Sequence, residues 1–304
     1  MKRVILSILA LALFVCSAKA QLLYKISGNG LSKPSYIVGT FHLAPATIID
    51  EIPGVREALN SVEQVCGEID LLRAVAPEYL EQIYVRGILP FSLRIDDMLS
   101  ESEMARLNAY MREKFGGDFT DEDVYEAMSM MRPSDLVSSF TNMVFAESIP
   151  NYEEGNFMDV YFQSEAQRQG KECIALETIE FQMEMLHGPI IMKEECEQLM
   201  FIVDQTEIFE QCVCLMVEGY YSQNIRRLAR AMVAISGNEE ESFDDVMVVS
   251  RNNNWIEQMP RIMAEKSTLF YVGAAHLPKK CGMIRLLRRA GYKVTPVKNK
   301  KQVS

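Results

Sequence analysis

Residues 35–43 have the sequence SYIVGTFHL, and residues 269–277 have the sequence LFYVGAAHL. In both stretches an apolar run ends at a glycine, and a histidine follows three positions later. Short runs of branched and aromatic residues bounded by glycine are typical of buried strands, and the glycine lets the backbone turn sharply or approach another group. The two stretches therefore predict two strands that present His42 and His276 just beyond their carboxyl ends.

Other strand patterns lie mostly towards the two ends of the chain, with helical patterns between them. Alternation of strand and helix predicts an α/β or α+β fold, with a mixed, largely parallel central sheet that both ends of the chain complete. The further strands are expected at 22–28, 62–70, 171–177 and 292–297, and the helices between them at 53–62 and 277–291.

The middle of the chain has almost no strand pattern. Over about 75–165 and 178–265 the apolar residues recur at helical spacing, which predicts a large helical insertion. No linker rich in Pro, Gly or Ser divides the chain. We therefore expect one domain over 21–304.

The first 20 residues have the pattern of a secretory signal peptide. A basic MKR start precedes an apolar run over 4–16 and the small-residue site AKA at 18–20. The run is shorter than the ~20 residues that a spanning helix needs. We expect cleavage near Ala20 and a periplasmic or secreted protein. Lipidation at Cys16 is the alternative, but the Phe and Val before it are not the small residues that normally precede a lipidated cysteine.

Charge and hydropathy exclude two classes of partner. The chain has 31 basic and 42 acidic side chains, and cleavage of the leader would leave 28 basic ones and a net charge of −14. Nucleic acid and anionic membranes require a positive surface, and no later segment is apolar enough to span a membrane. We expect a peptide or small-molecule substrate. The oligomeric state and the pairing of the cysteines stay open.

Carboxylates follow two of the other predicted strands, Glu68 in VEQVCGEID and Glu177 in KECIALE. A charge at a buried strand end is costly unless it is paired or bound to metal. In open α/β sheets the carboxyl ends of the strands form the edge at which ligands bind. Two histidines and two glutamates at that edge predict a site for a divalent metal.

Such a site favours metal-dependent hydrolysis. The cation lowers the pKa of a bound water and polarises a carbonyl, while a carboxylate accepts the proton. We expect His42 and His276 as ligands, with Glu68 and Glu177 dividing the roles of ligand and general base. Arg251, in RNNNW, is a candidate to clamp a carboxylate or an oxyanion, with a surface position as the alternative. The third histidine, His187, is interpreted as a helix-end residue and not a ligand.

The order of segments resembles the TraB/PrgY/GumN family over about Leu22 to Val297. The segments are GTFH, CGEID, GKECIALETIEFQ, RNNNW and VGAAHLPKKCGMIRLLRRAGYKV, with a long helical stretch between the second and third. That family includes the Tiki proteins, extracellular metal-dependent proteases that trim Wnt ligands. It is similar, at greater distance, to erythromycin esterases and ChaN-like haem-binding proteins, which share the paired G-x-x-H arrangement.

The resemblance implies that His42, Glu68 and His276 belong to an active site, with Glu177 and Arg251 as companions. It implies manganese or cobalt as the metal, with zinc as a further candidate, and peptidase activity as one form of the hydrolysis. An alternative stays open, in which the same crevice holds haem or a signalling peptide without turnover. The chain departs from the family pattern at Ala274-Ala275, inside the second G-x-x-H, and at Gly67, before Glu68.

Overall fold

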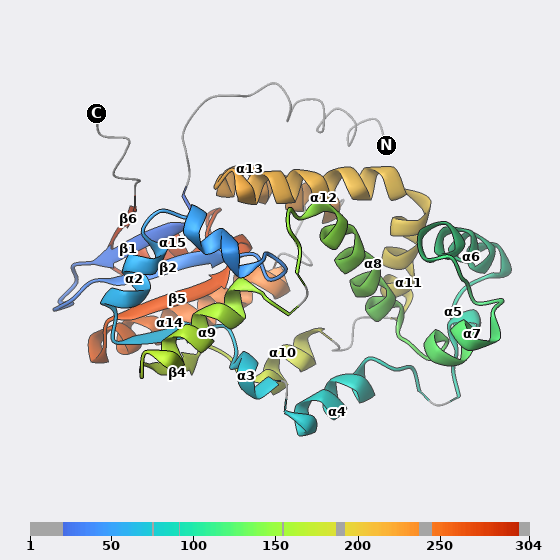
Figure 1. Ribbon diagram of the computed structural model, residues 1–304, viewed down its shortest axis with the longest axis horizontal. Helices are drawn as coiled ribbons and strands as arrows, with labels where there is room; N and C mark the ends of the chain where they lie inside the picture. The colour runs from blue at the N-terminus through green and yellow to red at the C-terminus, as the bar shows by residue number, and fades with distance from the viewer. Residues whose placement is uncertain are drawn as a thin grey trace. The chain divides into compact units, whose positions relative to one another are not determined.

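The computed structural model describes residues 21–74, 76–90, 92–153, 155–186, 192–236 and 245–297. The predicted signal peptide and the predicted position of His187 lie outside these residues. Within them all six expected strands form, and they make one sheet (Figure 1). The strands are β1 (Leu23–Ser27), β2 (Ser35–Thr40), β3 (Gln64–Gly67), β4 (Glu172–Ala175), β5 (Thr268–Gly273) and β6 (Lys293–Pro296).

The sheet has the strand order β4-β3-β5-β2-β1-β6. The pairs β4–β3, β3–β5 and β5–β2 are parallel, whereas β1 is antiparallel to both of its neighbours. Strands from the two ends of the chain, blue and red in Figure 1, lie side by side, with Val38 opposite Tyr271 and Thr40 opposite Gly273. The predicted mixed, largely parallel sheet completed by both chain ends is therefore confirmed.

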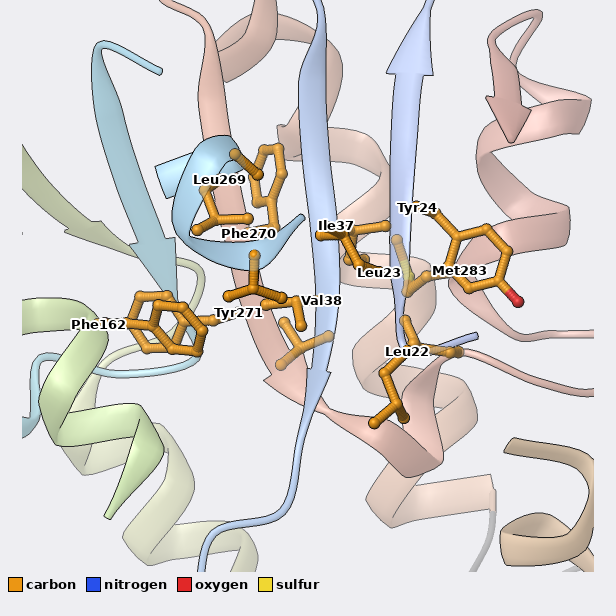
Figure 2. Packing of buried hydrophobic residues seen from close by; sticks show 14 of the residues in the cluster. Leu22, Leu23, Tyr24, Ile37, Val38, Phe162, Leu269, Phe270, Tyr271 and Met283 are labelled. Carbon is orange, nitrogen blue, oxygen red and sulfur yellow. The ribbon is translucent and has the colours of Figure 1, made fainter. Parts of the chain in front are cut away.

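The core surrounds the central strands, because both faces of β2 and β5 are apolar. Ile37, Val38 and Phe270 are fully buried (Figure 2). Tyr271 stacks on Phe162 with ring centroids 5.3 Å apart. The same ring explains the glycine that departs from the family pattern, since a Cβ at Gly67 would lie 2.4 Å from the Tyr271 ring.

The chain forms two compact units. Unit 1 comprises the described parts of 1–74, 147–178 and 212–304, and it contains the sheet. Its helices are η1 (Ala46–Glu51), α2 (Val55–Ser61), α3 (Leu71–Ala74), α9 (Met158–Arg168), most of α12 (Thr206–Tyr221), α13 (Ile225–Ser236), the π-helical turn η2 (Asp245–Ser250), α14 (Arg251–Glu265), η3 (Ala274–His276) and α15 (Met283–Arg289).

Unit 2 comprises 75–146 and 179–211, and its described residues are helical, as the missing strand pattern predicts. Whether the chain is one domain stays a prediction. The helices of unit 2 are α4 (Pro77–Arg86), α5 (Ile95–Met98), α6 (Glu101–Phe115), α7 (Glu122–Met128), most of α8 (Pro133–Ser148), α10 (Ile179–Leu186) and α11 (Met192–Asp204).

Two local predictions need correction or refinement. The helix expected from residue 277 begins only at Met283, because a tight turn at Gly282 brings the backbone so close to Pro278 that no Cβ fits. Strand β3 ends at Gly67, so Asp70 does not continue the strand beside Glu68 and instead accepts a hydrogen bond from Gln163.

Two further features concern cysteines and membranes. The six cysteines within the described residues are free thiols. In the same part of the chain, no helix combines the length and the apolar character that crossing a bilayer requires.

Candidate functional site

The carboxyl ends of four adjacent parallel strands bring the predicted site residues to one edge of the sheet. His42 follows β2, His276 ends the short η3 helix after β5, Glu68 follows β3 and Glu177 follows β4. A backbone hydrogen bond from Glu177 N to Glu68 O, 2.9 Å long, ties the last two together just beyond the strands. The strand-end argument therefore places these four residues correctly.

The glycines of the two matching stretches allow the strand ends to approach closely. A Cβ at Gly39 would lie 3.0 Å from Ala274, so β2 packs directly on the turn after β5. A Cβ at Gly273 would lie 3.3 Å from both Glu68 Oε1 and His42 Nε2, and 3.6 Å from His276 Cδ2. The missing side chain lets His42, Glu68 and His276 converge beside Gly273 at distances too short for an unstrained methyl group, and we call this place the cradle.

Arg251, the first residue of α14, joins the carboxylates beside the cradle. Its Nη2 donates to Glu68 Oε2 (2.5 Å) and Glu177 Oε2 (2.8 Å), and its Nε donates to Glu177 Oε1 (2.9 Å). All three side chains are at most 9% exposed. Trp255, one helical turn later, donates from Nε1 to Glu177 Oε1 (2.8 Å). Glu177 therefore holds Arg251 and Trp255 in place and does not border the cradle.

The hydrogen bonds of His276 define its tautomer. A guanidinium group can only donate, so the 3.2 Å contact between Arg251 Nη1 and His276 Nε2 requires a lone pair on Nε2. The proton is then on Nδ1, which donates to Asn252 Oδ1 at 2.8 Å. Burial lowers the pKa of His276 to about 4, against the opposing effect of Glu68, so the ring is neutral. Its basic nitrogen points towards Arg251 and Glu68.

His42 is held by Asp159, a residue in the first turn of α9. Asp159 Oδ2 accepts from His42 Nδ1 (3.3 Å), and Asp159 Oδ1 accepts from Thr40 Oγ1 (2.8 Å). Desolvation lowers the pKa of His42, but the charge and hydrogen bond of Asp159, with the charge of Glu68, outweigh it and raise the pKa to about 9. The His42 side chain is 63% exposed, so its Nε2 borders both the cradle and solvent.

Glu68 is the carboxylate of the cradle. Its Oε1 accepts from Gly273 N at 2.7 Å and lies 3.9 Å from His276 Nε2. Burial raises its pKa, but the charge of His42, the charge that His276 acquires only below about pH 4, the charge of Arg251 and the Gly273 hydrogen bond lower it to about 2. Glu68 is therefore ionised at any physiological pH and is only weakly basic.

The chain matches the TraB/PrgY/gumN family over residues 22–296. It belongs to the TraB/PrgY/gumN family. Searches of curated proteins and of solved structures give no match. The family membership inferred from the order of the sequence segments is confirmed, and the matched region contains every residue of the site described above.

The donor groups of this TraB/PrgY/gumN protein suit a divalent metal. Each histidine has its Nδ1 engaged by an oxygen of a neighbouring side chain, the arrangement that directs Nε2 to a metal. The cradle brings the His42 nitrogen and the Glu68 carboxylate to a shared space. As the side chains stand, however, the described residues contain no cluster of three or more His, Cys, Asp and Glu arranged to hold a metal. In the structure His276 Nε2 instead lies 3.2 Å from Arg251 Nη1.

Three important side chains of the site were missed from the sequence, namely Asp159, Asn252 and Trp255. None follows a strand, so the strand-end argument could not find them. Helical periodicity is the signal that could have revealed these residues. Asp159 shares the buried face of α9 with Phe162, and Asn252 shares the buried face of α14 with Trp255. A charged or amide residue on the apolar face of a helix needs a polar partner in the interior.

The first prediction concerns Asp159 and the charge of His42. In the metal-free protein, Asp159→Asn removes the charge that raises the His42 pKa, so this pKa should fall from about 9 towards the unperturbed value of about 6.5. An NMR titration of histidine-labelled protein measures it directly. The matched control is Asp50→Asn, an exposed aspartate that pairs with Arg56. An unchanged His42 titration in Asp159→Asn would show that the pairing does not exist in solution.

Proposed function

We propose that this protein is a divalent-metal-dependent hydrolase, with a peptide or small-molecule substrate, that acts in the periplasm or outside the cell after cleavage near Ala20. One observation carries the proposal. Two oriented histidine rings and an ionised carboxylate converge beside Gly273 at the carboxyl edge of the sheet, and His42, with its pKa raised to about 9, would release a proton on binding a cation. His42, Glu68 and His276 are the proposed ligands, and a two-histidine, one-carboxylate set accepts manganese, cobalt or zinc.

Within this site each side chain has a separate task. A bound cation would lower the pKa of a water towards neutrality and polarise a substrate carbonyl. Asp159 and Asn252 orient the two imidazoles. Glu68, with its low pKa, is suited to bind a cation and poorly suited to accept a proton, so we assign it the ligand role and not that of general base.

Arg251 supplies a fixed positive charge beside the cradle. If His276 Nε2 bound a cation in place of its contact with Arg251 Nη1, that Nη1 group would be placed to donate to the oxygen on which negative charge develops during attack at a carbonyl. Glu177 accepts from the guanidinium group, and the Trp255 ring, whose centroid lies 4.9 Å from Arg251 Cζ, packs against it. We therefore assign Glu177 the positioning of Arg251 in place of a proton-accepting role.

The test of the proposal is metal binding. We expect wild-type protein loaded with manganese, cobalt or zinc to retain the metal after desalting, and His42→Ala/His276→Ala to lose it, as measured by mass spectrometry of the metal. His187→Ala, at the chain's third histidine, is the matched control and should behave as wild type. Equal, minimal metal in wild type and the double variant would end the metal-hydrolase proposal.

Trp255 provides a second readout in solution. It is the only tryptophan of the chain, and its ring lies 4.3 Å from the His276 ring. Paramagnetic manganese or cobalt bound at His276 should quench its fluorescence, saturably in wild type and not in the double variant.

Turnover separates hydrolysis from ligand capture. Metal-loaded enzyme should cleave members of a panel of peptide and ester substrates in many-fold molar excess. Stoichiometric loss of a peptide without products would instead support the signalling-peptide alternative. A haem absorbance band on titration, abolished in His42→Ala, would support the haem alternative.

A further inference from the structure

The charge of the chain is divided unevenly between its two units. Residues 75–146 and 179–211 carry 21 acidic and 7 basic side chains, whereas the rest of the chain carries 21 acidic and 24 basic ones. Unit 2 therefore has a net charge of −14 and the remainder +3. Unit 2 also contains 11 of the 19 methionines. A strongly acidic helical unit attracts cationic partners.

A surface groove lies among α5, α6 and α11 of unit 2. It encloses about 600 Å³. Its apolar lining comes from Met98 and Leu99, where α5 ends, and from Met200 and Phe201 of α11. Leu99 and Met200 are 7% exposed and form the floor, while Phe201 is 37% exposed and available for contact. Methionine suits such a surface because its unbranched, polarisable side chain adapts to differently shaped apolar partners.

Carboxylates border this lining. Two of them are fixed by helix capping, because Arg94 N donates to Asp97 (2.9 Å) and Ser100 N donates to Glu103 (2.8 Å). These contacts set the position of the charges and do not remove them. The charged lining is four carboxylates and one ammonium group, namely Asp97, Glu103, Glu197 and Asp204 with Lys193. Lys193 lies 3.6 Å from Glu197, and Arg106, beside the lining, pairs with Asp204 at 2.7 Å, so four carboxylates and two cations leave the rim a net charge of −2.

We propose that this groove binds a basic amphipathic helix of a partner protein. An apolar floor with an acidic rim is complementary to a helix that has apolar residues on one face and Lys or Arg on the other. The rim selects the charge of the helix, and the methionine and phenylalanine side chains accept its apolar face. This proposal concerns unit 2 alone and does not depend on the proposed hydrolase activity.

The probe is a fluorescent synthetic peptide with leucines at helical spacing on one face and lysines on the other. Anisotropy with the full mature chain should show saturable binding that weakens as salt is raised, because the attraction is between exposed charges. Phe201→Ser and Glu197→Lys should each weaken it by about tenfold or more, equivalent to about 1.4 kcal/mol. Their matched controls, Leu80→Ser on α4 and Glu113→Lys on α6, change exposed residues outside the groove lining and should bind as wild type.

Two further peptides decide between the groove and bulk charge. A peptide with glutamate in place of lysine should not bind, and a scrambled peptide of the same composition should bind at least about tenfold more weakly. Equal binding of the original and scrambled peptides, or equal loss in the groove and control variants, would overturn the proposal. His42→Ala/His276→Ala should bind the peptide normally, so a failure of the groove can be distinguished from a failure of the metal site.

Discussion

Arg251→Met will be about 3–5 kcal/mol less stable than wild type at neutral pH, because it removes the partner of two buried carboxylates. Glu68 and Glu177 are each at most 9% exposed and both pair with this one guanidinium group. Methionine fills most of the volume but compensates neither charge. Urea unfolding at pH 7 measures the difference. Arg261→Met is the matched control, since Arg261 lies on the same helix with a 72% exposed side chain and should cost within about 0.5 kcal/mol.

The loss of stability in Arg251→Met should become smaller as the pH falls. In the wild type the folded-state pKa of Glu68 is lowered to about 2 from 4.5, so the stability that its pairing contributes is present above about pH 4.5 and disappears as the pH falls through about 2. In Arg251→Met the part of that contribution that comes from Arg251 is already absent, while the parts from His42, His276 and the Gly273 hydrogen bond remain. The difference in the free energy of unfolding between the two proteins should therefore decrease from pH 7 to about pH 3. A difference in the free energy of unfolding below about 1 kcal/mol at pH 7 would contradict the pairing of Arg251 with Glu68 and Glu177.

The sequence predicted the fold and the positions of the strand-end residues of the candidate site, because both depend on strand ends. Apolar runs that end in glycine or charge identify β2, β3, β4 and β5, and parallel pairing then brings their carboxyl ends to one edge. His42, Glu68, Glu177 and His276 follow from this rule alone. The turn before α15 did not follow, because the pattern of apolar residues continues through it and only the close approach at Gly282 shows the break.

The roles of the site residues were harder to predict from the sequence than their positions. Glu68 and Glu177 follow their strands in the same way in the sequence. Arg251 pairs with both. They differ because Trp255, 78 residues further along the chain on α14, also donates to Glu177, whereas the Gly273 N–H donates to Glu68 at the cradle. Helical periodicity can mark a polar residue as buried, but it does not identify a partner that is distant along the chain. For Asp159 that partner is His42, 117 residues away.

A second large effect, on turnover, is expected from the addition of a single methyl group at Gly273. Gly273→Ala places a methyl group in the cradle, 3.3 Å from His42 Nε2 and Glu68 Oε1. The backbone at this position, with φ −49° and ψ 133°, is ordinary for alanine, so the fold should keep its stability within about 1 kcal/mol. Under the proposed function, metal and substrate would lose the space that they share. We expect turnover to fall by about 100-fold, comparable to the effect of displacing a reacting group by 1 Å.

Gly117→Ala separates this steric effect from the general cost of the substitution. Its Cβ would lie 3.2 Å from the Asp121 carboxylate, a contact of the same kind, but in unit 2. Both variants should unfold like wild type in urea, and only Gly273→Ala should lose metal and turnover. Wild-type metal affinity in Gly273→Ala would place the metal elsewhere. Arg251→Met removes a charge and leaves the space at Gly273, whereas Gly273→Ala fills that space and leaves the charges. Stability lost in the first and metal lost in the second would therefore show that the charge network supports the fold and that the cradle is the reactive centre.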